Sequence, residues 1–525
     1  MKKLRVKLLL MMVLALVLVI GSTGCGSPQT QDEQGEVPAA TEKEQAITVG
    51  TSFFPSNLDA AEEWNGWYTV EYGLGETPVK LNSAMELEPW VAESWQQVDE
   101  NTWEIKIKDG VKFQNGKTVD AAAVKASFAR TIAINPRAQE LFNIDTMEAT
   151  GNTLVVKTKT PNPAFMSSLV DPLAVVADAA AAEEMGDQFK TAPVLTGPFK
   201  AVKFEKDVEI AVERNEDYWG EKATLQRVVF KLIPDDNTRI MAMQSGDIDV
   251  VENVPVGSLD LFTQKDSYQV LSESGVRDHI LVFNLAKPVF QDPAVRKAIN
   301  TAIDRNALAH DLMKGMAVAG VGPFPLVTPF GGDKLTGYSY DAAAAAKLLD
   351  DAGWVLNSEG VRAKGSQKLD IVIKTYSSRP ELPQIGQVLQ SQLAQIGIKV
   401  SVEVVENIDE SMSSGNFDAV IYSMNTAVTG DPQYFLNIFF KTGADSNYGK
   451  YSNPALDKVI EELGRTFETE KRYQLAQEAQ QIILDDAAFV FLIYPKSNLV
   501  AKSNISGLSL HPSDFYFLNT QIEVN

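Results

Sequence analysis

The chain has 525 residues, 45% of them hydrophobic and 22% charged, a composition typical of a large globular protein. Its 69 acidic side chains outnumber its 47 basic ones, and the formal net charge of -22 argues against nucleic acid as a partner. A single cysteine rules out an internal disulfide, and three histidines are too few to favour a metal site built from protein side chains.

The N-terminus carries the pattern of a secretion signal. Four cations among the first seven residues precede the 13 apolar residues Leu8–Ile20 and the small residues Ser22–Gly24. Thirteen apolar residues are too few to span a membrane, which takes about 20. Because Cys25 follows directly, the segment resembles a bacterial lipoprotein signal, although Ser22 stands where such signals usually carry leucine. We predict a signal peptide over 1–24 and lipidation of Cys25; the alternatives are an ordinary signal with an incidental cysteine, or a spanning anchor.

Residues 25–45 are predicted to be a disordered tether. The stretch holds two prolines and five acidic residues but no aromatic residue, so it cannot bury enough apolar surface to order itself. One acyl chain binds a membrane only marginally, so stable anchoring implies more than one chain on Cys25. Signal, lipid and tether together predict an extracytoplasmic protein anchored to the cell membrane.

Beyond the tether, strand and helix periods alternate without a fixed repeat, which predicts a mixed α/β fold. Trp103–Lys108 alternates with period two and reaches a turn at Asp109-Gly110, as expected of a half-exposed strand. Asp292-Pro293 opens a predicted helix, with the acid as N-cap and the proline in the first turn.

The clearest predicted unit is a strand, helix and strand between residues 369 and 404. Leu369–Ile373 is predicted to be a strand, Leu382–Ile396 a helix that ends at Gly397, and Ile398–Val404 the next strand. A crossover of this kind joins parallel strands.

Ligands of open α/β sheets bind beyond the carboxyl ends of the strands, and this rule selects two loops. The first is Tyr376–Glu381, and the second is Ser423–Pro432, which follows a predicted strand at Ala419–Tyr422. Arg379 in the first loop could form a bidentate contact with a ligand carboxylate. The alternative is a surface arginine that pairs with Glu381.

Aromatic side chains gather in one segment near residue 64 and around the two loops. They are candidates for the walls of a ligand cleft, although most of the 45 aromatic residues must belong to the core. The candidates are Trp64 and Trp67 in one segment, with Tyr68 and Tyr72 beside them, and Tyr376, Tyr422 and Tyr434 around the two loops.

Catalytic motifs are missing from the sequence. Gly110–Thr118 is similar to a phosphate loop, but five residues separate its glycines where four are needed, so we predict a pair of turns. The adjacent acids of Asp235-Asp236 point apart on any helix or strand. We therefore predict a protein that is not an enzyme.

Several longer strings carry a resemblance to a known family. The strings are Glu88–Trp95, Thr102–Glu104, Asp109–Gly116, Thr196–Phe199, Arg214–Gly220, Gly246–Asp249 and Val295–Ile299. In this order they resemble the bacterial solute-binding proteins of family 5, the peptide and nickel receptors of ABC importers. The resemblance covers residues 46–525.

This resemblance implies an α/β periplasmic-binding-protein fold of type II, with two hinged lobes and an inserted extra subdomain. Mapped onto this chain, lobe I would comprise 46–77, 200–277 and 493–525, the inserted subdomain 78–199, and lobe II 278–492. It also implies a monomer that works with an ABC permease and ATPase. Lobe closure would shift an existing equilibrium between open and closed forms.

For the cargo, the resemblance gives two conflicting indications. Dipeptide receptors hold the peptide amino group with an aspartate, and Val428 stands at the matching position, whereas Arg379-Pro380 matches the arginine that holds the carboxylate. In nickel receptors an arginine holds the carboxylates of a metal chelate, and counting from the family motif places it at Arg137; its alternative role is a salt bridge with Glu140.

The main hypothesis is therefore a carboxylate-rich chelate of nickel or another metal, held by Arg137 and Arg379, with no resident cofactor and no metal ligated by the protein. Short peptides are the alternative cargo. Two other classes stay open: a lipid-anchored hydrolase, which would need an activated nucleophile, and a signalling or chaperone-like receptor without a partner permease.

Overall fold

A computed structural model describes residues 45–525. The predicted signal, the predicted lipidation of Cys25 and the predicted tether up to residue 44 lie outside the described residues. Gln45, the last residue of the predicted tether, is fixed to the body of the protein. Its side-chain amide donates to the carbonyl of Val524 and its side-chain oxygen accepts from the Val524 N–H, both at 2.9 Å. Within residues 45–525, no helix has the length and apolar character needed to cross a membrane.

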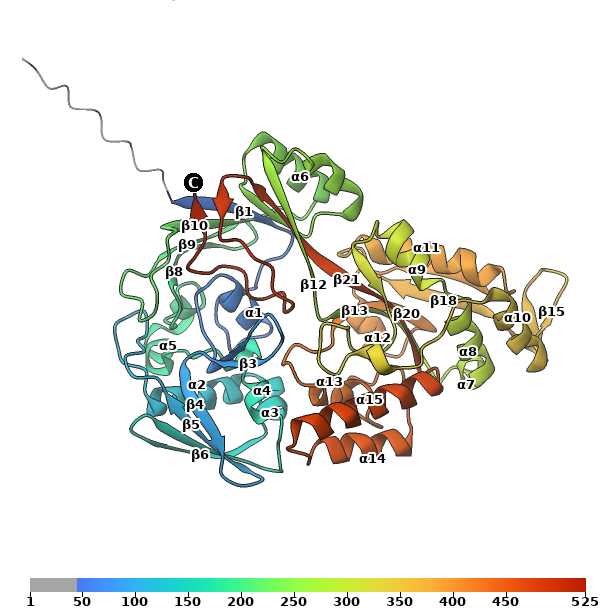
Figure 1. The fold of residues 1–525 in the computed structure, drawn as a ribbon, viewed down its shortest axis with the longest axis horizontal. Helices are drawn as coiled ribbons and strands as arrows, with labels where there is room; N and C mark the ends of the chain where they lie inside the picture. The colour runs from blue at the N-terminus through green and yellow to red at the C-terminus, as the bar shows by residue number, and fades with distance from the viewer. Residues whose placement is uncertain (1–44) are drawn as a thin grey trace, which may run out of the picture. The chain divides into compact units, whose positions relative to one another are not determined.

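The largest element is a 12-stranded mixed sheet (Figure 1), which confirms the predicted α/β class. One half is made of β1 (Ala46–Thr51), β8 (Phe199–Glu205), β9 (Glu209–Arg214), β10 (Arg227–Leu232), β11 (Val250–Glu252) and β12 (Tyr268–Ser274). Because β1 lies parallel to both β10 and β11, the carboxyl ends of these three strands meet at one edge.

The other half contains β13 (Arg277–Phe283), β14 (Ala317–Ala319), β18 (Asp370–Thr375), β19 (Lys399–Val404) and β20 (Ala419–Asn425). β18 is parallel to β19 and to β20, and α11 (Glu381–Ala394) connects β18 to β19, so the predicted crossover is confirmed. The helix ends before Ile396, earlier than predicted, because its last residues form tight turns that lead to Gly397. Gly397 has φ +81°, a conformation that favours glycine.

One long strand, β21 (Phe489–Lys502), belongs to both halves of the sheet. Its first part pairs with β13 and β14 up to Pro495, and its second part pairs with β12 from Lys496 onward. Figure 1 shows β12 and β13 beside this strand, and only Gly275 and Val276 separate β12 from β13. The boundaries of the two lobes stay a prediction, but the strand partners change close to residues 277 and 493.

A separate four-stranded antiparallel sheet lies between β1 and β8 in the sequence. It has the order β4 (Ala92–Gln97), β5 (Thr102–Ile107), β7 (Thr153–Thr158) and β6 (Ile144–Thr150), and β5 confirms the strand predicted at Trp103. A short hairpin, β2 (Val79–Leu81) and β3 (Leu87–Pro89), precedes it. Gly110 and Gly116 have φ +84° and +85°; Gly110 precedes a bridge between Lys112 and Thr118, and Gly116 lies in the turn that this bridge closes, so the predicted pair of turns is confirmed.

Helices supply most of the remaining core. α8 (Pro293–Ala302) begins as predicted, with Asp292 accepting from the Ala294 N–H at 3.0 Å and with Val295 and Ile299 buried. The other helices are α1 (Asn65–Glu71), α2 (Ala121–Ile134), α3 (Pro136–Phe142), α4 (Phe165–Ser168), α5 (Ala179–Met185), α6 (Asp236–Ser245), α7 (Pro288–Gln291), α9 (Arg305–Ala307), α10 (Ala342–Asp351), α12 (Ile408–Ser413), α13 (Gln433–Phe439), α14 (Pro454–Leu463) and α15 (Thr469–Asp485). Short strands complete the fold: β15 (Val355–Leu356), β16 (Arg362–Lys364), β17 (Gln367–Lys368), β22 (Ile505–Ser506) and β23 (Glu523–Val524).

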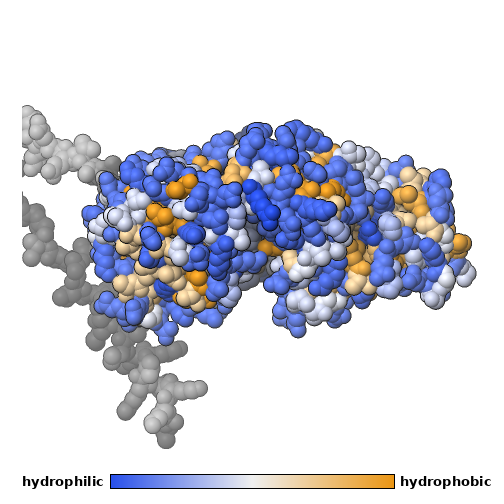
Figure 2. Space-filling view, turned by 90° about the horizontal axis from the view of Figure 1, so that it is seen from below, coloured by the Kyte–Doolittle hydropathy of each residue, from blue (hydrophilic) through white to orange (hydrophobic). Residues whose placement is uncertain are grey.

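The surface seen in Figure 2 is mainly hydrophilic, with hydrophobic residues in small separate groups. This distribution is ordinary for a folded protein, because scattered apolar side chains on a surface need no special explanation.

Candidate ligand-binding site

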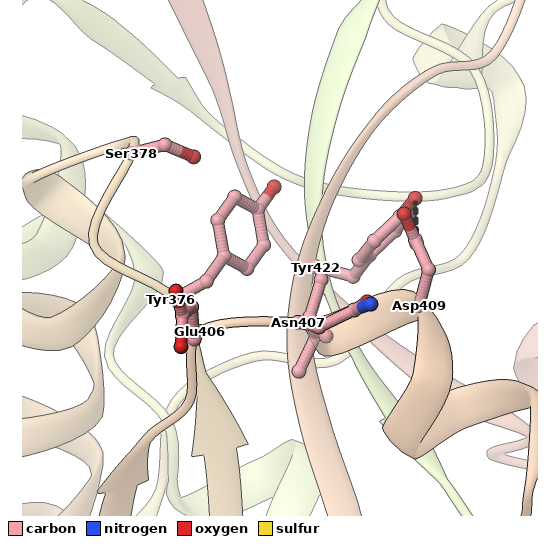
Figure 3. A pocket seen from close by; sticks show the side chains of 7 residues that line it. Tyr376, Ser378, Glu406, Asn407, Asp409 and Tyr422 are labelled. Carbon is pink, nitrogen blue, oxygen red and sulfur yellow. Dashed lines mark hydrogen bonds between the residues drawn. The ribbon is translucent and has the colours of Figure 1, made fainter. Parts of the chain in front are cut away.

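A cavity of about 630 Å³ lies at the carboxyl ends of β18 and β19 (Figure 3). This is the position at which open α/β sheets bind ligands, and the volume is within the range of small-molecule sites. Its lining consists of Tyr376, Ser378, Glu406, Asn407, Ile408, Asp409 and Tyr422.

Two tyrosines form the aromatic part of the cavity. The rings of Tyr376 and Tyr422 have centroids 6.0 Å apart, and the Tyr422 hydroxyl donates to the Asp409 carboxylate at 2.9 Å, as drawn in Figure 3. The hydroxyl oxygen of Tyr376 accepts from the backbone N–H of Ser423 at 3.3 Å. Burial raises the pKa of both phenols, so both stay protonated and can donate hydrogen bonds.

Part of this lining was missed by sequence reasoning. The loop after β18 supplies Tyr376 and Ser378 as predicted, but the loop after β19, which carries Glu406 to Asp409, was not selected. The same strand-end rule could have found it, since β19 was itself predicted as a parallel strand.

The second predicted loop, Ser423–Pro432, contributes no side chain to the cavity. Asp431 is bound there by Arg472 of α15, whose Nη2 lies 2.7 and 2.6 Å from its two carboxylate oxygens, and Val428 is 9% exposed. The loop is therefore packed against α15.

Arg379 is half-buried in the first loop, and its guanidinium has no hydrogen bond or ion pair within residues 45–525. The alternative pairing with Glu381 is not formed, because Oε1 of Glu381 lies 3.0 Å from Nε2 of the fully buried His279. Burial lowers the pKa of Arg379, and the nearby Arg277 lowers it further. Burial alone would raise the pKa of Glu381, but the contact with His279 and the charge of Arg379 reduce it to about 2.

A second arginine near this loop is already satisfied. Arg277, at the start of β13, donates to the Asp514 carboxylate at 2.8 Å and to the Ser423 hydroxyl at 3.3 Å, and Asn425 donates to Asp514 at 3.0 Å. Burial would raise the pKa of Asp514, but Arg277 outweighs it and the net pKa is lowered.

Arg137 lies in a different environment, at the start of α3. Its two terminal nitrogens donate to the Asp171 carboxylate at 2.7 and 3.0 Å, so its ion-pair partner is Asp171 and not Glu140. Its guanidinium carbon lies 4.2 Å from the ring centroid of Trp64. Burial lowers the pKa of Arg137, but Asp171 and the Tyr434 phenol outweigh it and the net pKa is raised.

The predicted site residues therefore fall into two groups. Tyr376, Arg379 and Tyr422 belong to the cavity and its loop, whereas Arg137, Trp64 and Tyr434 gather around Asp171. The space lined by Trp64, Trp67 and Arg137 does not admit a water molecule. Trp67 packs against Phe515 with centroids 4.8 Å apart, and Tyr72 is fully buried against Phe230 at 3.9 Å.

No group of three or more histidine, cysteine, aspartate or glutamate side chains within residues 45–525 has the arrangement of a metal site.

Comparison with known proteins places the chain in one family. Residues 86–447 match the family described as "Bacterial extracellular solute-binding proteins, family 5 Middle". The chain is 26% identical over 451 residues to the nickel-binding protein NikA of Staphylococcus aureus, covering 86% of this chain and 89% of the relative. It is 25% identical over 529 residues to the oligopeptide-binding protein AppA of Bacillus subtilis, covering 97% of each.

Solved structures show the same likeness. The crystal structure of a nickel ABC transporter protein from Bacillus halodurans is similar with a TM-score of 0.77 and 31% identity, over 92% of this chain and all of that one. The family consists of extracytoplasmic substrate-binding proteins of ABC importers, and it confirms the predicted two-lobed class of fold. The chain belongs to the bacterial extracellular solute-binding proteins of family 5.

Proposed function

We propose that this protein captures a small carboxylate-bearing ligand and delivers it to the permease of an ABC importer, without performing chemistry on it. The observation that carries the proposal is Arg379, a half-buried guanidinium without a carboxylate partner in the described residues, beside the cavity at the strand ends. A buried cation of this kind gains most from a ligand carboxylate, because paired N–H donors match its two oxygens.

The proposal includes the location and the assembly. The protein would act as a monomer outside the cytoplasm, held at the membrane by lipid on Cys25, with the partner permease and ATPase nearby. The supporting observation is the order of cations, apolar run, small residues and cysteine at the N-terminus.

Two cargoes fit an unpaired arginine. The first is a chelate of nickel or another metal in which the metal arrives bound by a small carboxylate-bearing molecule; relatives named as nickel-binding proteins support it. The second is a short peptide, supported by the relative named as an oligopeptide-binding protein and by the acidic side chains Glu406 and Asp409 in the cavity, which suit a positively charged group.

The test is isothermal titration calorimetry of the purified protein with nickel(II) plus L-histidine and with alanine peptides of two to five residues. Arg379→Gln should weaken the binding of whichever probe binds by at least tenfold, which is about 1.4 kcal/mol. The matched control is Arg465→Gln, which removes an exposed arginine beyond α14 and should leave the affinity unchanged. Equal affinity of the wild type and Arg379→Gln would remove Arg379 from the site, and no binding of any probe would contradict both cargoes.

A further inference from the structure

Two acidic side chains, those of Glu71 and Glu252, have no partner in the described residues. Glu71 is the last residue of α1 and is only 8% exposed, and Glu252 is the last residue of β11 and is half-buried. Within residues 45–525 neither carboxylate takes part in a hydrogen bond or an ion pair. A buried carboxylate without a partner is costly, so this arrangement calls for an explanation.

The backbone places Glu252 at a ligand-binding edge. β11 ends there beside the carboxyl end of its parallel neighbour β1, and Arg379 follows the carboxyl end of β18 in the other half of the sheet. The strand-end rule that selects the loop of Arg379 therefore selects Glu252 as well.

Contacts of the C-terminal segment link Glu71 to Arg277, which lies near the loop of Arg379. The backbone N–H of Leu518 donates to the carbonyl of Glu71 at 2.9 Å, and Asp514, four residues earlier in the sequence, is bound to Arg277 at 2.8 Å. Tyr68 lies three residues before Glu71 and so on the same face of α1. The charges of Glu71, Asp514 and Glu252 raise the pKa of the Tyr68 phenol beyond the effect of burial, and the charge of Arg379 lowers it, so all four charges act on this phenol.

The two free carboxylates and the free guanidinium are therefore complementary. Asp514 is already paired with Arg277, whereas within residues 45–525 the carboxylates of Glu71 and Glu252 and the guanidinium of Arg379 have no partner. Burial and the charges of Glu252 and Asp514 raise the pKa of Glu71 well above its usual value. Burial and the charge of Asp514 raise the pKa of Glu252 to about 7. A cation placed between these acids would remove their repulsion and stabilise their charged forms.

We propose that Glu71 and Glu252 form a subsite for a protonated amino group of the ligand while Arg379 binds its carboxylate, so that the cargo is zwitterionic. An ammonium group has three N–H donors and no acceptor, which matches two carboxylates. The inference rests on the proposed function and narrows its substrate class to ligands with a free amine. A chelate whose amine is bound to the metal lacks the required charge.

The experiment compares alanine peptides of two to five residues with their N-acetylated forms by calorimetry at pH 7, on the wild type and on the double variant Glu71→Gln/Glu252→Gln. In the wild type each free peptide that binds should do so at least tenfold more tightly than its acetylated form, and in the double variant the two forms should bind alike. The control Glu183→Gln/Glu184→Gln changes the net charge equally at exposed positions of α5 and should behave as the wild type. Thermal unfolding of each variant checks that it folds.

Proton release gives a second measurement. Because the amine favours the charged carboxylates, binding at pH 6 should release up to about one proton per ligand, so the binding enthalpy should depend on the ionisation enthalpy of the buffer. Glu252→Gln should reduce this dependence.

The other outcomes separate the subsite from the function. Equal binding of free and acetylated peptides would overturn the amine subsite and leave the receptor function intact. Binding of nickel(II) with L-histidine alone, at equal affinity in the wild type and the double variant, would also overturn the subsite and would leave a chelate as cargo. No binding of either class would overturn the proposed function and the subsite with it.

Discussion

The two arginines expected at the ligand site lie in opposite electrostatic environments. Arg137 holds the buried Asp171 with both terminal nitrogens and packs on Trp64, whereas Arg379 has no partner within residues 45–525 and is repelled by Arg277. Both are arginines in segments where a family resemblance predicts a carboxylate contact. The difference shows that residue type and sequence position indicate a possible anchor, while the partner already present decides whether the charge is free.

Removal of the two arginines should therefore affect different properties of the protein. Removal of Arg137 should mainly affect the stability of the fold, because it leaves a carboxylate that is 2% exposed without compensation. Removal of the Arg379 guanidinium should mainly affect ligand binding, because within residues 45–525 no partner loses a contact with it.

The largest expected effect follows from Arg137→Met. Breaking one side of a buried ion pair should lower the free energy of unfolding by about 3–5 kcal/mol, whereas Arg379→Met should lower it by less than about 1 kcal/mol. Urea unfolding followed by tryptophan fluorescence measures both. The double variant Arg137→Met/Asp171→Leu should recover part of the loss, since it removes the uncompensated charge as well.

If Arg137→Met instead leaves the unfolding transition unchanged and abolishes binding of the probe ligands, the structural role assigned to Arg137 is wrong. Arg137 would then be a ligand anchor as the resemblance implies, and Asp171 would be its orienting partner.

The sequence predicted the elements that depend on local pattern. The crossover from β18 through α11 to β19, the N-cap at Asp292 and the turns at Gly110 and Gly116 follow from periodicity and from backbone preferences of proline, glycine and aspartate. These features need no knowledge of distant residues.

The site was harder to predict because its properties depend on contacts distant in sequence. Asp171 is 34 residues from Arg137, and His279 is 102 residues from Glu381, so neither pairing could be deduced from spacing. The nearest acid in sequence, Glu140 or Glu381, was the natural alternative partner in each case, and in neither case does it form the ion pair.

A smaller effect concerns the pH dependence of the loop that carries Arg379. Burial lowers the pKa of His279; Glu381 opposes this shift, and the charges of Arg379 and Arg277 add to it. The folded protein therefore keeps this histidine neutral below pH 6.5, whereas the unfolded chain takes up a proton there. Stability should therefore fall as the pH decreases below 6.5, by up to about 1.4 kcal/mol per pH unit. Glu381 adds a second loss between pH 4.5 and about 2, since its folded pKa lies below its unfolded one.

The measurement is the unfolding free energy of the wild type and His279→Asn from pH 7.5 to 5.0. The slope between pH 6.5 and 5.0 should be shallower in the variant, even if the variant is less stable throughout. His310→Gln, at an exposed position of the same half of the chain, should keep the wild-type slope. An equal slope in all three proteins would show that the contact between His279 and Glu381 does not govern acid stability.

The smallest effect sharpens the assignment of the aromatic residues. Trp64 was expected on the wall of a ligand cleft because aromatic residues cluster in its segment. In the structure it is 59% exposed and lies over the guanidinium of Arg137, which is itself paired with Asp171. An exposed cation–π contact contributes about 0.5–1 kcal/mol, so Trp64→Leu should lower the unfolding free energy by that amount and Trp64→Phe by less. Neither variant should change the affinity for the probe ligands by more than about twofold, which is about 0.4 kcal/mol. A tenfold loss of affinity in Trp64→Leu would instead place the Arg137 cluster in the ligand site, since a residue that only supports the ion pair has no reason to affect binding at Arg379.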